Sequence, residues 1–122
     1  MVELKLYCIV SQEAVKASGG NRGKIGAQIG HAFTEAIFDA QERFPQIVAD
    51  YRATGQVAKV CLTASEETLH SLSRLYKDKC GVALIKDAGR TVFPRPMITA
   101  LGIGPIDPAT REDILKDLNP WI

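Results

Sequence analysis

The chain has 122 residues, of which 46% are hydrophobic and 24% charged, and its formal net charge is +1. This length predicts one domain with its own core, spanning residues 1–122. The near-neutral charge excludes a chain that is basic throughout, so any nucleic-acid contact must use a local patch. The first ten residues lack the basic and apolar regions of a signal peptide, and no apolar run approaches a membrane span of roughly 18 residues. We therefore expect a cytoplasmic protein without membrane contact.

Periodicity and turn residues predict the secondary structure. In chain order, the expected elements are a strand over 2–10, a loop over 11–23, a helix over 24–40, a short helix between Pro45 and Gly55, a strand over 57–62, a helix from Ser65 to Gly81, strands over 82–85 and 97–103 joined by an irregular connection, and a last helix that opens at Asp107 and Pro108. Asn21 and Ser65 are the expected N-caps. Leu69, Leu72, Leu75 and Tyr76 should form the inner face of the third helix, and Ile114, Leu115 and Leu118 that of the last.

Strands that alternate with helices favour parallel crossovers, whereas the last two strands are joined by a connection without a helix and should be antiparallel. The strand over 57–62 is mostly apolar, which predicts a central position. The sequence therefore indicates a single α/β domain, a three-layer α/β/α arrangement with a mixed four-stranded sheet. Three cysteines, Cys8, Cys61 and Cys80, show no metal or disulfide spacing and are expected to be free and buried.

The first long helix has two distinct faces. At 100° per residue, Lys24, Gln28, His31 and Glu35 fall within an arc of about 60°, well separated from the apolar stripe. On spacing alone this is typical of a solvated helix face. Gly26 and Gly30 lower helix stability, and a close approach to another element or to a ligand would explain them.

Two further segments carry polar residues beside predicted strands. Asp87, Arg90 and Thr91 follow the end of a short apolar strand, where ligands of α/β sheets bind, although a simple turn explains them equally well. Thr99 is the polar residue of the last apolar strand and is either a β-branched filler or part of a site. Gly102 in the same strand indicates a bulge or close packing.

Taken together, these segments resemble the archaeal and eukaryotic type of peptidyl-tRNA hydrolase, the type 2 family. Residues 23–32, GKIGAQIGHA, look like that family's G-K-x-A-A-Q-x-x-H-A helix. Residues 87–91, DAGRT, and 99–105, TALGIGP, look like its D-A-G-x-T and T-V-L-x-I-G-P segments. The resemblance covers nearly the whole chain and implies a mixed sheet layered with helices. It departs from the family pattern at residues 11–13, at Lys86 and Val92, and at the C-terminus.

The resemblance implies hydrolysis of the ester that joins a peptide to tRNA, with peptidyl-tRNA as partner and with no metal or cofactor. Carried over by position, the catalytic candidates are Lys24, Asp87 and Thr99. The residues expected to line the site or hold the tRNA are Gln28, His31, Thr91, Lys16, Arg22, Arg90 and Arg95. Asp87 would orient or activate water, Lys24 would stabilise negative charge or pair with Asp87, and Thr99 would position a water or the carbonyl.

Two alternatives remain open on the sequence. One is a divergent relative that binds RNA or protein without catalysis, and the other is a hydrolase of a different acyl ester. The sequence does not fix the oligomeric state; a homodimer is one option, with Phe93, Met97 and Trp121 as apolar candidates for its contact if they are exposed.

Overall fold

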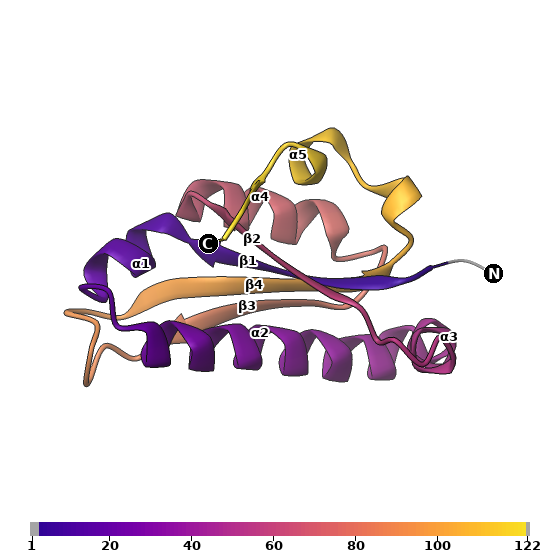
Figure 1. The fold of residues 1–122 in the computed structure, drawn as a ribbon, viewed down its shortest axis with the longest axis horizontal. Helices are drawn as coiled ribbons and strands as arrows, with labels where there is room; N and C mark the ends of the chain where they lie inside the picture. The colour runs from indigo at the N-terminus through magenta and orange to yellow at the C-terminus, as the bar shows by residue number, and fades with distance from the viewer. Residues whose placement is uncertain (1–2, 122) are drawn as a thin grey trace.

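The computed structural model describes residues 3–121, and it contains one mixed sheet (Figure 1). Its strands are β1 (Lys5–Ser11), β2 (Lys59–Ala64), β3 (Val82–Asp87), β4 (Met97–Ile106) and β5 (Asn119–Pro120), in the order β3-β4-β1-β2-β5. β1 and β2 are parallel, and the other neighbours are antiparallel, including β3 and β4 as predicted. The described sheet therefore has five strands rather than the expected four, because a two-residue strand near the C-terminus pairs with β2.

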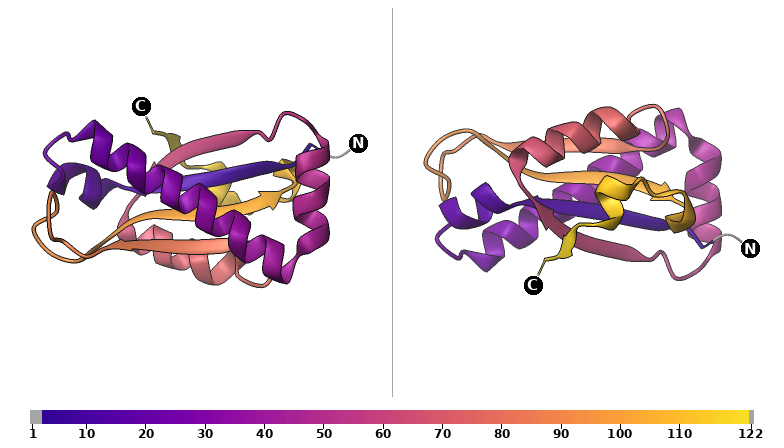
Figure 2. Two further views of the ribbon diagram at one scale, coloured as in Figure 1. Left: turned by 90° about the horizontal axis from the view of Figure 1, so that it is seen from below. Right: turned by 90° about the horizontal axis from the view of Figure 1, so that it is seen from above.

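Helices cover both faces of this sheet, as Figures 1 and 2 show. α2 (Arg22–Arg43) runs along one face with α3 (Pro45–Ala53) at its end, and α4 (Glu66–Tyr76) and α5 (Asp113–Lys116) lie on the other. The Asn21 side chain accepts a hydrogen bond from the Lys24 N–H at 2.9 Å, so it is the N-cap of α2. The predicted α/β class with two helical layers is confirmed.

The segment after β1 is helical where a loop was predicted. α1 spans Gln12–Ala17, and the Ser11 side chain caps it by accepting a hydrogen bond from the Ala14 N–H at 3.1 Å. Ala14 is fully buried, so this short helix gains packing energy that the glycine-rich composition of 11–23 conceals. The glycines Gly19 and Gly20 come after the helix, at positive φ.

The strand over 57–62 was expected to be central, and β2 is an inner strand, paired with β1 on one side and with the two-residue β5 on the other. β2 lies one place from the edge of the sheet, and its first residue, Lys59, is exposed. The central strands are β1 and β4, whose residues are almost all buried. β2 has an apolar composition like that of β1 and β4, but half of its residues are only partly buried. Composition alone therefore did not predict this difference in burial.

Other local predictions need correction. The last helix is broken into a 3-10 turn, η1 (Pro108–Thr110), and α5, with Leu115 buried but Ile114 39% exposed. Leu75 is 38% exposed and lies off the inner face of α4. The three cysteines are free, with Cys8 and Cys80 buried and Cys61 half-buried. None of the helices in the described part of the chain combines the length and apolar character that crossing a membrane requires.

Close packing of α2 on the sheet depends on one glycine of β4. A Cβ atom added at Gly102 would lie 2.1 Å from the Ala32 carbonyl oxygen, so only glycine allows the helix this approach. Gly26 and Gly30 have no described atom within 4 Å of such a Cβ, so packing against another element does not explain them. The close approach between helix and sheet that was predicted for Gly26 and Gly30 is made instead by Gly102 of β4.

Candidate active site

A salt bridge joins the first turn of α2 to the end of β3. The Lys24 Nζ lies 2.8 Å from Asp87 Oδ2, and both side chains are largely protected from solvent, with 23% and 13% exposed. The N-cap at Asn21 sets where α2 begins, and β3 ends at Asp87 itself. The site thus lies outside the carboxyl end of a strand, where α/β sheets bind ligands.

Gln28 and Thr99 extend this pair into the protein. The Thr99 hydroxyl donates to Gln28 Oε1 at 2.7 Å, and Gln28 Nε2 donates to Asp87 Oδ2 at 3.4 Å. Thr99 is fully buried and Gln28 is 4% exposed. The hydroxyl therefore fixes which end of the Gln28 amide faces the carboxylate. The polar face of α2 is accordingly packed against the sheet at Lys24 and Gln28, and the solvated-face interpretation is wrong for these two residues.

The environment of Asp87 favours its charged form. The Lys24 ammonium holds the pKa of the Asp87 carboxyl below its usual range, and the Gly89 N–H, which donates to Oδ1 at 2.8 Å, lowers it further. Partial burial opposes these effects, and the charge of His31 adds to them. Gly89 has φ +74°, and a Cβ there would lie 2.2 Å from the Arg95 carbonyl carbon, so this turn requires glycine.

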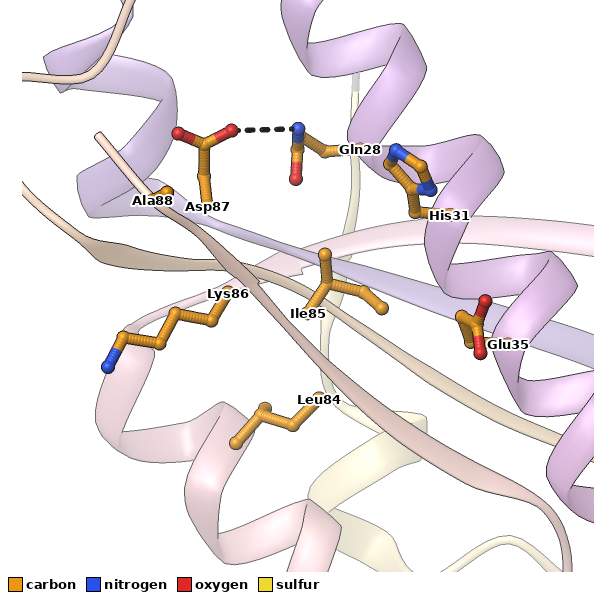
Figure 3. A pocket seen from close by; sticks show the side chains of 8 residues that line it. All are labelled: Gln28, His31, Glu35, Leu84, Ile85, Lys86, Asp87 and Ala88. Carbon is orange, nitrogen blue, oxygen red and sulfur yellow. Dashed lines mark hydrogen bonds between the residues drawn. The ribbon is translucent and has the colours of Figure 1, made fainter. Parts of the chain in front are cut away.

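An open hollow of about 280 Å³ lies beside Asp87, between α2 and β3 (Figure 3). It is lined by Gln28, His31 and Glu35 from α2 and by residues 84–88 from β3 and the turn that follows. In Figure 3, Asp87 points toward Gln28, while Lys86 points away from it on the other side of β3. The hollow is open to solvent along two turns of α2.

The remaining predicted residues lie farther out. Lys16, Arg22, Arg90 and Arg95 are all exposed. They belong to α1, the start of α2 and the β3–β4 connection, which lie at one end of the molecule (Figure 1). Thr91 is exposed in the same connection and makes no hydrogen bond within the described chain. The structure therefore brings together Lys24, Gln28, Asp87 and Thr99, with His31 lining the hollow, whereas Thr91 does not line it.

Sequence reasoning missed two contributors. Phe93 is 2% exposed, and its ring centroid lies 5.8 Å from Lys24 Nζ, close enough for a cation–π contact. The sequence signal that could have indicated Phe93 was its position as an aromatic residue in a connection that contains prolines. The backbone N–H of Gly89 could be found only from the fold. Phe93, Met97 and Trp121 were the candidates for an exposed dimer contact. Phe93 and Met97 are buried in the core, so the prediction is wrong for these two, and Trp121 is half-buried against the same cluster.

The fold and the site define a small α/β enzyme whose ionised carboxylate, ammonium and oriented amide suit hydrolytic chemistry. The chain belongs to the PTH2 family: the family model described as "Peptidyl-tRNA hydrolase PTH2" matches residues 4–120. The residues quoted for the sequence resemblance lie within this match.

Individual relatives agree with the family. A "Peptidyl-tRNA hydrolase" of Staphylothermus marinus is 35% identical over 99 residues, which cover 80% of this chain and 82% of the relative. A "Peptidyl-tRNA hydrolase" of Methanocaldococcus jannaschii is 34% identical over 88 residues, which cover 71% of this chain and 76% of the relative. A mouse "Peptidyl-tRNA hydrolase 2, mitochondrial" is 39% identical over 85 residues, or 69% of this chain and 47% of the longer relative.

Proposed function

We propose that this protein hydrolyses the ester bond between the peptide and the tRNA of peptidyl-tRNA, so that both are released. The observation that carries this proposal is the Lys24–Asp87 pair, set beside Gln28 in an open hollow of a chain that belongs to the PTH2 family. An open site suits a substrate as large as tRNA better than an enclosed pocket would.

The ester chemistry requires a water nucleophile, stabilisation of the oxyanion and protonation of the leaving 3′ oxygen. A carboxylate with a lowered pKa is a weak base, so Asp87 acts chiefly by accepting a hydrogen bond from the attacking water and orienting it. The Lys24 ammonium, 2.8 Å from Asp87 Oδ2, is then beside the place proposed for that water and stabilises the negative charge that develops on the carbonyl oxygen. The water oxygen adds to the carbonyl carbon, the proton that the water loses passes by way of the Asp87 carboxylate to the 3′ oxygen, and the bond between that oxygen and the carbonyl carbon breaks. Asp87 and Lys24 thus divide the reaction between two side chains from different elements.

Thr99 acts through Gln28 rather than on the substrate. It is fully buried, and its hydroxyl is committed to Gln28 Oε1. Gln28 then presents its amide N–H groups at the edge of the hollow, next to Asp87. We therefore assign Thr99 as a positioning residue, which narrows the role expected from the sequence.

The tRNA is held at the end of the molecule that carries Lys16, Arg22, Arg90 and Arg95. Exposed cations of this kind bind phosphates irrespective of base sequence, which suits an enzyme that acts on many tRNAs. The expected signature is a KM that rises steeply with salt concentration. His31, which lines the hollow, and Thr91 remain proposed substrate contacts.

We place the protein in the cytoplasm, although its mouse relative is named as mitochondrial. A homodimer would need an apolar contact other than the buried Phe93 and Met97, and Phe38, which is 60% exposed on α2, is the candidate. Light scattering of wild type and Phe38→Ser would test this, because a monomeric wild type would refute it.

The test is release of labelled peptide from peptidyl-tRNA by wild type, Lys24→Ala and Asp87→Ala. Lys77→Ala and Asp50→Ala are matched controls, because both residues are exposed, the first just after α4 and the second on α3, away from the hollow. We expect turnover to fall at least 100-fold in the two site variants and to be retained in the controls, with all four proteins folded. A folded wild type that binds tRNA without cleaving peptidyl-tRNA would favour a binding protein without catalysis. Cleavage of other acyl esters but not of peptidyl-tRNA would favour a hydrolase of a different ester.

A further inference from the structure

β3 is the last strand on its side of the described sheet, and its outer edge opens into the hollow. Side chains of a strand alternate between its two faces, so a pocket that lies on one face is lined by every second residue. This hollow is lined by five consecutive residues, 84–88, which include Leu84 and Lys86 from the far side of β3 (Figure 3). It therefore follows the backbone edge of the strand.

The hydrogen bonds around β3 show which backbone groups face this edge. The Gly104 N–H donates to the Gly81 carbonyl at 2.9 Å, and the register then pairs Ala83 with Gly102. Backbone groups in an antiparallel pair face the partner at every second residue, so those of Val82 and Leu84 face outward. The Val82 N–H agrees with this, because it donates to Asp39 Oδ2 of α2 at 2.8 Å rather than to β4. Leu84 is the next outward residue and lines the hollow.

We propose that the peptide part of the substrate binds as an added strand along the free edge of β3, parallel to it, with its amino terminus toward Glu35. This inference rests on the proposed function, because it names how the same site holds the peptide. Pairing with a strand edge uses main-chain hydrogen bonds, so peptides of any sequence are accepted. The occupant is set by continuity, since the edge leads directly to Asp87, where the ester must lie.

The direction of the peptide follows from the chemistry. Its esterified carboxyl end lies at Asp87, the C-terminal residue of β3, and the rest of the peptide runs back toward Val82, parallel to the strand. Glu35 lies seven residues beyond Gln28 on α2, or about 10 Å along the helix axis. An extended peptide covers this length with about three residues. The Glu35 carboxylate lines the hollow and has no hydrogen bond or ion pair within the described chain, so it is available to an ammonium group.

The strand pairing is tested with tetrapeptidyl-tRNAs in which one internal amide at a time is replaced by an ester, which removes the N–H with little change in shape. Release of the tRNA is followed with wild-type protein. We expect replacement at alternate positions to raise KM about three- to tenfold, and replacement at the positions between them to raise it less than twofold. An equal effect at every position, or no effect at any, would overturn the added strand. Failure to hydrolyse the unmodified substrate would instead count against the proposed function.

The proposed contact between Glu35 and the amino terminus of the peptide is tested with Glu35→Gln and tripeptidyl-tRNA. We expect KM to rise at least threefold for the substrate with a free amino terminus, and to rise less for its N-acetylated counterpart. Glu42→Gln is the matched control, because Glu42 lies one further heptad along α2 and outside the hollow. Equal effects of the two variants, or equal effects on the two substrates, would refute the assignment of Glu35.

Discussion

Gly102→Ala should both destabilise the protein and disturb its site, because this residue is where α2 rests on the sheet. The added Cβ would lie 2.1 Å from the Ala32 carbonyl oxygen, 2.8 Å from its carbonyl carbon and 2.8 Å from the Ala36 Cβ. Contacts below 3.0 Å do not occur for real Cβ atoms, and the nearest of these atoms belong to helix backbone, so α2 must move by roughly 1 Å.

The cost of this movement follows from overpacking. Forced insertion into a packed core typically costs 1–3 kcal/mol, and a backbone contact places this variant at about 3 kcal/mol. For a domain of this size that corresponds to a fall in melting temperature of roughly 12 °C. Because α2 carries Lys24 and Gln28 while β3 carries Asp87, the shift also separates the catalytic pair. We expect turnover to fall at a temperature where the variant is still folded.

The measurement is denaturant unfolding, with turnover followed under folded conditions. Gly26→Ala is the control, because its added Cβ meets no described atom within 4 Å and alanine favours the helix by up to about 1 kcal/mol. A Gly102→Ala variant within 1 kcal/mol of wild type and with normal turnover would refute the packing argument. Equal destabilisation by both variants would show that the glycines act through something other than this contact.

Three further predictions concern the site and its scaffold. Thr99→Val leaves the buried Gln28 carbonyl oxygen without its donor, so the free energy of unfolding should fall by about 1–3 kcal/mol and kcat should drop. Thr99→Ser keeps the hydroxyl and should restore both, and equal losses in the two variants would contradict this role of the hydroxyl. Lys24→Met should raise the pKa of Asp87, measured by carbon-13 NMR titration. In wild type the lowered pKa stabilises the fold above the pKa of the unfolded carboxyl, and this contribution disappears as the pH falls through the folded pKa, so an unchanged acid-unfolding profile in Lys24→Met would contradict the pairing. Ser65→Ala should cost about 1 kcal/mol in a thermal melt, because its side chain caps α4, and no loss would argue against the cap.

The sequence by itself determined the elements whose signals are local. Asn21 and Ser65 were identified as N-caps because a side-chain cap acts on the next turn of the same chain. The helix spacing also gathered Lys24 and Gln28 on one face, and the resemblance added Asp87 and Thr99. The α/β class and the antiparallel pairing of the last two long strands followed from the order and length of the connections.

Tertiary structure alone decided the rest, because the deciding contacts join distant parts of the chain. The helix α1 depends on burial of Ala14, and the place of β2 near the edge depends on which strands pair. The orientation of the Gln28 amide depends on a hydroxyl 71 residues away, and the free edge of β3 exists only once the sheet is assembled. Such long-range contacts leave no periodic signal in a single sequence, since each requires two segments to be placed at once.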